Sequence, residues 1–518
     1  MFRWPGIAMV FILCLSSRIS AQQNFEFFQP VEPPRNIQVK VHRGMAMAAP
    51  ENSAPAIEMC IQDYCEWVEI DVRLTSDGQH VVIHNDTVDA TTDGKGRVAG
   101  FTMAELKQLD AGSWFAKRFA GERLLTLPEA LELAKGRINL DLDCKHIDAG
   151  RLVKEVMAAR MEKQVIAYGS PEILSEIKAA SHGTVARMAA YRPKTMSFES
   201  FVQDVGPAAV EINADDVTAE LCQKFHAVGI KVEANVLAGK WSNPGVWAQV
   251  IDAGADSLQT DDPASVLFFN ARRRIGTFPV KIAAHRGVNR YAPENTLPAI
   301  REAARLGVDY TEIDIRTTRD GKYVLIHDGT VDRTTTEKGN VRDKTFDELT
   351  RLSAGIRFGN PFLESHVPSF DEGLTALGDS MAAYLDAKDI APEALIAAIH
   401  KYQLEDRHVV YQSVECCGKL RTLDPDVRTL PPLKRLDQID AVAAIQPYGV
   451  DASWYILSED MIAMCHQKGI QVFSDLLGPN ETIEQYQKVI SWKIDCIQTD
   501  HPLRVLRAIE LMADKDSR

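Results

Sequence analysis

The chain has 518 residues, too many for one ordinary domain, and its composition is typical of globular proteins, with 45% hydrophobic and 25% charged residues. Its 58 basic and 72 acidic side chains give a net charge of −14 at pH 7. A nucleic-acid partner requires a basic surface, so this balance argues against one. It leaves room for a local basic cleft that binds a small anionic ligand.

The first residues predict an export signal. Arg3 precedes an apolar run over residues 6–15, and a polar stretch then ends at Ala21. We expect residues 1–21 to be removed, residues 22–36 to form a flexible lead-in, and the mature protein to be periplasmic or secreted. An apolar run of about ten residues is too short to span a bilayer, so we expect no stable membrane insertion after cleavage.

The cysteines give a weaker signal. Cys14 also fits a lipoprotein signal, but Leu13 stands where a small residue would be expected. Eight cysteines follow, and their spacing matches no zinc motif, so we interpret them as buried or incidental thiols. Cys60 and Cys65 fall on one predicted helix. An oxidising compartment would allow a disulfide to form, but the sequence does not say which cysteines would pair.

Four motifs of the first half recur 243 positions later, which means that the two copies align without a net gap across them. The pairs are Val41–Gly44 and Ala284–Gly287, Glu69–Arg73 and Glu312–Arg316, Val82–His84 and Leu325–His327, and Leu142–Lys145 and Leu385–Lys388. The repeating unit is far longer than a solenoid repeat, so each copy is interpreted as a complete domain. We place the domains at residues 37–270 and 280–515.

Within each copy, short apolar strand patterns alternate with amphipathic helix patterns. The first copy has eight predicted strands, near residues 38–42, 67–73, 138–143, 164–168, 184–189, 209–213, 231–236 and 257–261. The second also has eight, near residues 281–285, 310–316, 382–388, 408–412, 426–430, 449–452, 471–474 and 496–500. Eight strand–helix pairs in a unit of this size predict an α/β fold of two tandem (β/α)8 TIM barrels. A doubly wound sheet is the alternative, but it does not need eight strands.

An additional hairpin is predicted after the second strand of each copy. An Asp-Gly pair at residues 77–78 precedes the apolar segment that ends at His84, and residues 320–321 precede the segment that ends at His327. A turn at these positions folds the histidine back beside the preceding strand. We therefore expect His84 near Asp71, and the second copy to repeat this arrangement.

Acidic residues alternate along the second predicted strand. Glu69, Asp71 and Arg73 share one face of it, and Asp143 and Lys145 alternate in the same way on the third strand. Carboxylates that face a barrel interior need a counter-charge or a metal, and oxygen ligands from two strands suit Ca²⁺ or Mg²⁺. The competing interpretation is a buried ion-pair network in which the arginine or the lysine neutralises the acids.

Histidines flank these acids in both copies, at His42 and His84 and again at His285 and His327. Two histidines beside a carboxylate cluster are suited to general base and general acid catalysis. Basic side chains in the same motifs would then bind phosphate oxygens, namely Arg43, Lys145, Arg286 and Lys388. We interpret Pro-Glu-Asn, at residues 50–52 and 293–295, as chain turning and helix capping.

In combination, these motifs resemble those of the glycerophosphodiester phosphodiesterase family. His-Arg-Gly, Pro-Glu-Asn, Glu-x-Asp-x-Arg-x-Thr, Val-x-x-His, Thr-Thr-x-x-x-Gly and a closing Thr-Asp-x-Pro occur in both copies. The resemblance implies a TIM barrel that hydrolyses a small-molecule glycerophosphodiester to glycerol 3-phosphate and an alcohol, in glycerophospholipid metabolism. It also implies a divalent metal and two catalytic histidines in each copy. The implied metal ligands are Glu69, Asp71 and Asp143, and Glu312, Asp314 and Asp386.

Some positions depart from the family pattern. Asp143 and Asp386 stand where the family usually has glutamate, and Asn85 stands where the family and the second copy, with Asp328, have aspartate. We expect both copies to hold metal, with the second closer to the family pattern. Two alternatives stay open. One barrel could be catalytic and the other a binding or structural domain, or the enzyme could act on intact phospholipids or glycerol-phosphate polymers.

Overall fold

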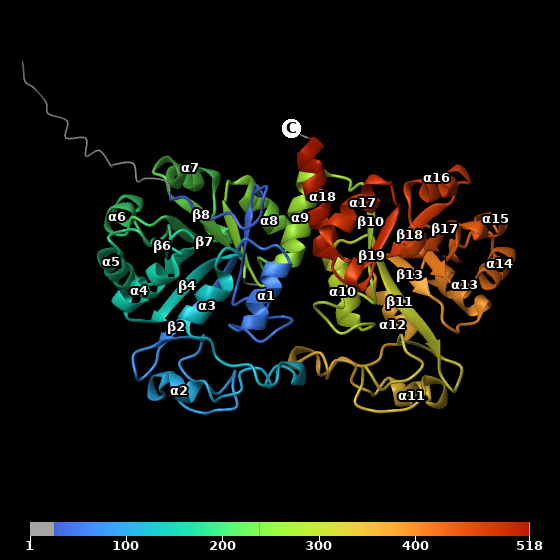
Figure 1. Cartoon of the computed structure of the whole chain (residues 1–518), viewed down its shortest axis with the longest axis horizontal. Helices are drawn as coiled ribbons and strands as arrows, with labels where there is room; N and C mark the ends of the chain where they lie inside the picture. Colours follow the sequence, from blue (N-terminus) through green and yellow to red (C-terminus); the bar gives the residue numbers. More distant parts are fainter. Residues whose placement is uncertain (1–24, 238, 517–518) are drawn as a thin grey trace, which may run out of the picture.

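The computed structural model describes residues 25–237 and 239–516, and it contains two barrels of parallel strands that lie side by side (Figure 1). The predicted export signal lies outside the described residues. The first barrel consists of β1 (Gln38–Val41), β2 (Trp67–Leu74), β4 (Asn139–His146), β5 (Val165–Tyr168), β6 (Ala186–Ala190), β7 (Ala209–Asn213), β8 (Lys231–Asn235) and β9 (Ser257–Thr260). Strand β1 pairs with both β2 and β9, which closes the ring. The predicted architecture is confirmed.

The second barrel repeats this order, with one irregular strand. It consists of β10 (Lys281–Ala284), β11 (Tyr310–Thr317), β13 (Ala382–Asp386), β14 (His408–Tyr411), β15 (Thr429–Leu430), β16 (Pro432–Leu433), β17 (Gly449–Ala452), β18 (Gln471–Asp475) and β19 (Cys496–Thr499). A single fifth strand was predicted at residues 426–430. Instead β15 pairs with β14 and β16 pairs with β17, with Pro431 between them. Two consecutive prolines lack the N–H groups that a continuous ladder needs.

Helices cover the outside of both barrels (Figure 1). The first set is α1 (Ala54–Gln62), α3 (Leu127–Ala134), α4 (Ala149–Ala159), α5 (Pro171–Ser181), α6 (Phe198–Asp204), α7 (Ala219–Ala227), α8 (Pro244–Asp252) and α9 (Pro263–Ile275). The second is α10 (Leu297–Leu306), α12 (Phe370–Ala376), α13 (Pro392–Lys401), α14 (Val414–Leu423), α15 (Ile439–Ala443), α16 (Glu459–Gln467), α17 (Ile483–Ser491) and α18 (Pro502–Asp516). Within the described ranges, no helix is both long and apolar enough to cross a membrane.

A long excursion separates the second and third barrel strands of each unit. It contains the hairpin strand β3 (His80–Val82) and helix α2 (Met103–Leu106) in the first unit, and β12 (Tyr323–Leu325) and α11 (Phe346–Leu349) in the second. Strand β3 runs antiparallel to β2, and Gly78 in the turn has the left-handed φ of 72° that glycine favours. The predicted hairpin is confirmed. Short 3-10 turns complete the chain at Val98–Gly100, Lys117–Phe119, Ala214–Asp216, Val341–Asp343, Asn360–Phe362, Leu436–Gln438, Trp454–Ile456 and Gly478–Asn480.

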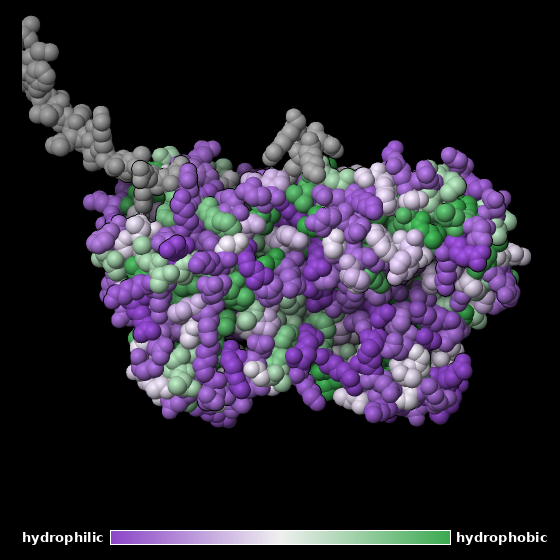
Figure 2. Space-filling model, viewed as in Figure 1, coloured by the Kyte–Doolittle hydropathy of each residue, from purple (hydrophilic) through white to green (hydrophobic). Residues whose placement is uncertain are grey.

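The two units share an extensive interface. Helices α1, α9, α10 and α18 lie between the barrels, and the two excursions meet below them, where the Asn360 N–H donates to the Phe115 carbonyl at 2.6 Å (Figure 1). A buried ion-pair cluster joins the ends of the chain, because Arg35 contacts both Glu66 and Glu510. The face shown in Figure 2 is mostly hydrophilic, with hydrophobic residues in small separate groups. The two barrels therefore form one compact body.

Candidate functional site

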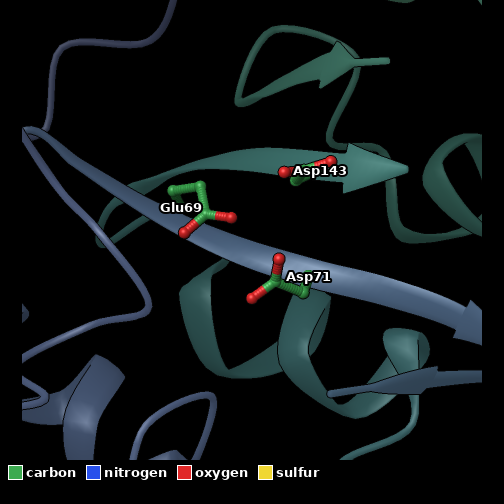
Figure 3. Close-up of side chains that lie close together, drawn as sticks. All are labelled: Glu69, Asp71 and Asp143. Atoms are coloured by element: carbon green, nitrogen blue, oxygen red, sulfur yellow. The ribbon is translucent and has the colours of Figure 1, made fainter. Parts of the chain in front are cut away.

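Three carboxylates meet at the carboxyl end of the strands in each barrel. Glu69 and Asp71 lie two residues apart on β2, and Asp143 of β4 is the register partner of Asp71 (Figure 3). One oxygen from each of the three lies within 4.8 Å of the others. The second barrel brings together Glu312, Asp314 and Asp386 within the same limit. The alternation in the sequence thus places all six acids in two equivalent clusters.

The clusters carry more negative than positive charge. Burial, followed by the charges of Asp71 and Asp143, raises the pKa of Glu69 well above its usual range, and Glu312 behaves in the same way. The Lys145 ammonium lies 2.5 Å from Asp143 and 3.3 Å from Asp71. In the second barrel, Lys388 also contacts two of the three acids. In each site, one ammonium and one guanidinium, the latter 3.6 Å from Asp71 or Asp314, face three carboxylates.

The structure therefore agrees only in part with the competing interpretation, a buried ion-pair network in which the arginine or the lysine neutralises the acids. The lysine does neutralise part of the cluster, but Arg73 does not, since its Nε donates instead to the carbonyl of His84 at 2.8 Å. Arg316 makes the equivalent bond to the carbonyl of His327. These arginines fix the backbone of the hairpin histidines relative to the acid-bearing strand.

The acid clusters fit a divalent cation. Asp71 Oδ1 and Asp314 Oδ1 are buried, and each faces a lysine ammonium, at 3.3 Å from Lys145 and 3.0 Å from Lys388. Each ammonium is shared with a second acid of its cluster, Asp143 or Asp386, so a divalent cation would compensate the remaining buried negative charge. Three carboxylates with no thiolate or imidazole among them suit a hard cation of the Ca²⁺ or Mg²⁺ type.

Each of the four histidines is anchored through its Nδ1 atom. In the first barrel, His42 lies 2.9 Å from Asp261 Oδ1 and His84 lies 2.8 Å from Asn85 Oδ1. In the second barrel, His285 lies 2.7 Å from Asp500 and His327 lies 2.7 Å from Asp328. An oxygen acceptor at Nδ1 favours the tautomer that carries its proton there, which leaves Nε2 free to exchange a proton with a substrate.

The aspartates that hold the first histidine of each barrel had no role in the sequence interpretation. Asp261 and Asp500 follow the last barrel strand, and the signal that could have found them is the repeated Thr-Asp-x-Pro motif. Because the last strand pairs with the first in both barrels, the motif lies beside the His-Arg-Gly loop. The closing motif is therefore part of the site.

The His-Arg-Gly loop is a tight left-handed turn. Arg43 and Gly44 have φ angles of 55° and 76°, and the Arg43 N–H donates to Glu69 at 2.8 Å. A Cβ on Gly44 would lie 2.8 Å from the Cβ of Ala56, so only glycine fits against the start of α1. The arginine side chain contacts Glu51 and approaches Asp71 at 3.6 Å. The guanidinium therefore lies at the rim of the acid cluster.

The interpretation of Pro-Glu-Asn as chain turning and helix capping was incomplete. Ser53, not Asn52, caps α1. Asn52 donates to Asp71 Oδ2 at 2.8 Å and accepts from the Asp71 N–H at 3.0 Å, and Asn295 makes the same pair of bonds with Asp314. The asparagine of this motif orients a carboxylate of the cluster.

The two sites differ in the groups that surround the hairpin histidine. In the second barrel, Arg333 bridges Asp328 and Glu294, and its hydrogen bond holds the pKa of Asp328 at about 2. In the first barrel, Asn85 and Ala90 occupy the corresponding positions.

The two barrels also differ in the interior side chains of β1, β4 and β8 and of their counterparts β10, β13 and β18. In the first barrel, the Lys40 ammonium lies 2.6 Å from both Asp141 and Glu233. In the second barrel, the partly apolar cluster of Ala283, Tyr384 and Phe473 takes the place of these charges. In the second barrel this layer is therefore mainly apolar and aromatic, with Tyr384 donating to Asp451 at 3.1 Å, whereas in the first barrel it is an ion-pair network.

Comparison with known proteins assigns the chain to a family. The model of the Glycerophosphoryl diester phosphodiesterase family matches residues 42–265 and 285–504. The chain belongs to this family. Each matched region contains two of the anchored histidines and one complete acid cluster. Membership makes the chain a phosphoric diester hydrolase with tandem domains.

The individual relatives named here each cover less than half of the chain. A glycerophosphodiester phosphodiesterase from Caldanaerobacter subterraneus subsp. tengcongensis is 30% identical over 244 residues, which cover 44% of this chain and 97% of the relative. Human glycerophosphodiester phosphodiesterase 1 is 38% identical over 159 residues, 29% of this chain and 48% of the relative. A solved phosphodiesterase from Oleispira antarctica, in complex with the product sn-glycerol-3-phosphate, is 28% identical and covers 45% of this chain and 96% of its own, with a TM-score of 0.39.

Proposed function

We propose that this protein hydrolyses glycerophosphodiesters to glycerol 3-phosphate and an alcohol, and that it depends on a divalent cation. The observation that carries the proposal is the twofold occurrence of one arrangement. In both barrels, the strand that carries two of the three acids pairs with the two strands that lead to the histidines, and both histidines are anchored through Nδ1. Family membership supports the reaction class. Glycerophosphodiesters derive from phospholipids, which would place the protein in lipid metabolism.

The acids would bind the cation, and the arginine and the lysine would bind the phosphodiester. Glu312, Asp314 and Asp386, and their counterparts in the first barrel, would hold Ca²⁺ or Mg²⁺, which supplies positive charge that polarises the phosphoryl group. Arg286 and Lys388, with their equivalents Arg43 and Lys145, would contact the phosphate oxygens and stabilise charge in the transition state. These side chains already lie against the acid cluster.

The histidines would move the protons. One Nε2 atom takes a proton from the attacking hydroxyl, a new P–O bond forms, and the P–O bond to the leaving alcohol breaks. The other histidine donates a proton to that alcohol. The attacking hydroxyl belongs to water, which gives glycerol 3-phosphate directly, or to the glycerol of the substrate, which gives a cyclic phosphate that water then opens to glycerol 3-phosphate. Each barrel contains such a pair of histidines, His42 and His84 in the first and His285 and His327 in the second.

A division of labour between the barrels is a second candidate function. In the second barrel, the hairpin histidine contacts the charged carboxylate of Asp328, which is itself paired with Arg333. In the first barrel, the hairpin histidine contacts the neutral amide of Asn85 instead. This asymmetry favours the second barrel as the main catalyst and the first as the weaker or binding domain.

We also propose that residues 1–21 direct export, because their pattern is that of a signal.

The test is release of glycerol 3-phosphate from glycerophosphocholine by the full chain, with and without EDTA. A His285→Ala/His327→Ala variant and a His42→Ala/His84→Ala variant would be measured beside it. We expect loss of activity with EDTA and a larger loss when the second pair is removed. Absence of turnover on glycerophosphodiesters, together with turnover on intact phospholipids or glycerol-phosphate polymers, would replace the proposed substrate class.

A further inference from the structure

The loop after the first strand differs between the two barrels in one respect. In the second barrel, Asn289, Arg290 and Tyr291 follow the His-Arg-Gly turn, where the first barrel has the three residues Ala46–Ala48. Three hydrogen-bonding side chains thus replace two alanines and a methionine. All three of the polar side chains make contacts beyond their own loop, and two of them reach the other barrel.

Arg290 and Tyr291 converge on one acid of the first barrel, Asp63. The Arg290 Nε lies 2.9 Å and 3.1 Å from the two carboxylate oxygens, and the Tyr291 hydroxyl donates to one of them at 2.9 Å. Asp63 is 1% exposed and Tyr291 is 0% exposed, so the contact is dry. Burial alone would lower the pKa of Arg290, but the Asp63 charge raises it, so the guanidinium stays charged.

A rigid turn presents Asp63 to the second barrel. Asp63 is the C-cap of α1, and Tyr64 follows it with a left-handed φ of 58°. The Cys65 N–H donates to the Cys60 carbonyl at 3.0 Å, and the Tyr64 N–H donates to the Ile61 carbonyl at 3.2 Å. These two bonds form a Schellman motif, which fixes the backbone around the acid.

Asn289 carries the contact into the second site. Its amide donates to Asp500 Oδ1, the same oxygen that His285 Nδ1 contacts at 2.7 Å. The amide therefore lies between the anchored residues 290–291 and the aspartate that holds the histidine. A cavity of about 290 Å³ lies at this junction and is lined by residues of both barrels, namely Met59, Arg118, Asn289, Arg290, Asp500 and His501.

We propose that Asp63 of the first barrel is a positioning residue for the second catalytic site. Asp63 fixes Arg290 and Tyr291, which holds Asn289 on Asp500, and Asp500 in turn orients His285. The inference rests on the proposed catalytic role of His285. The corresponding residues in the opposite direction are Leu306 at the end of α10 and Ala46 in the first loop, whose side chains form no hydrogen bonds. At this contact, the second site depends on the first barrel and not the reverse.

The experiment uses the full chain in a His42→Ala/His84→Ala background, so that turnover of glycerophosphocholine reports the second site alone. Asp63→Asn should lower kcat about tenfold or more with little change in KM, since a small misplacement of a catalytic group costs on the order of 10²-fold. Arg305→Ala is the matched control. It removes another ion pair between the barrels, 2.6 Å from Asp262, that does not lead to His285. We expect that variant to retain the kcat of the background.

A second variant covers the case in which Asp63→Asn fails to fold with an unpaired guanidinium. Asp63→Leu/Arg290→Met/Tyr291→Phe replaces the buried acid, guanidinium and hydroxyl with apolar side chains, which proteins often tolerate without loss of stability. It should keep the melting temperature of the background and still lose kcat. Full kcat in either folded variant, or equal losses in Asp63→Asn and Arg305→Ala, would overturn the inference. An inactive background would instead refute catalysis by the second site itself.

Discussion

Removal of the Asn295 amide should weaken metal binding in the second barrel. The amide donates to Asp314 Oδ2 at 2.6 Å and accepts from the Asp314 N–H at 3.0 Å. A hydrogen bond to a charged group contributes about 1.5–3 kcal/mol, and partners that orient metal ligands typically change affinity by about 10–100-fold. Asn295→Gly is the appropriate change, because the residue has a φ of 54° that glycine adopts without strain.

The measurement is calorimetric titration of Ca²⁺ and Mg²⁺ into an Asp143→Asn chain, in which the first site has lost a ligand. We predict that Asn295→Gly raises the dissociation constant by about 10–100-fold, equivalent to about 1.4–2.7 kcal/mol. Gln403→Gly is the matched control, since Gln403 also has a left-handed φ, of 52°, and lies outside the site. Equal affinities in the two glycine variants would refute the assigned role of Asn295.

Three further predictions concern stability and the difference between the sites. Gly287→Ala should lower the free energy of unfolding, measured by urea denaturation, by at least about 2 kcal/mol more than Gly321→Ala does. Both glycines have a positive φ, but only a Cβ added at Gly287 would lie within 3 Å of backbone atoms. Equal losses in the two variants would contradict this packing. The stabilising contact of Asp328 with Arg333, which lowers the pKa of Asp328 to about 2, should be present above pH 4 and be lost as the pH falls toward 2. Asp328→Asn should therefore destabilise the protein at pH 7 and progressively less in acid, and a difference independent of pH would count against this pairing. In a chain that lacks the second pair of histidines, Asn85→Asp should raise kcat up to about fivefold, since a charged acceptor adds about 1 kcal/mol to a hydrogen bond. An unchanged or lower kcat would show that the contact between His84 and residue 85 does not limit the first site.

The sequence was sufficient to predict the barrels and the acid clusters because both follow from local patterns. Alternation of period two on a strand puts Glu69 and Asp71 on one face, and parallel register then brings Asp143 beside them. An Asp-Gly turn brings the hairpin histidine back to the same strand. The split of the fifth strand in the second barrel also had a local signal, the two prolines at residues 431–432.

Contacts between distant parts of the chain could not be predicted in this way. Asp261 holds His42 from 219 positions away, and Arg290 reaches Asp63 from 227 positions away. No periodicity encodes such pairs, because closure of the barrel and docking of the two units create them. The role of Asn52 was hidden for another reason, since an asparagine before a helix is usually a cap and only the fold shows that its amide faces Asp71.

The central claim is that a cation-dependent phosphodiesterase site occurs in both barrels. The most direct measurement is glycerol 3-phosphate release from glycerophosphocholine by the full chain after EDTA treatment and after return of Ca²⁺ or Mg²⁺. We predict that EDTA abolishes release, that the cation restores it, and that release stops fully only when the catalytic histidines of both barrels, His42 and His84 together with His285 and His327, are disabled. Undiminished release in EDTA, or release by the chain that lacks all four histidines, would contradict the account.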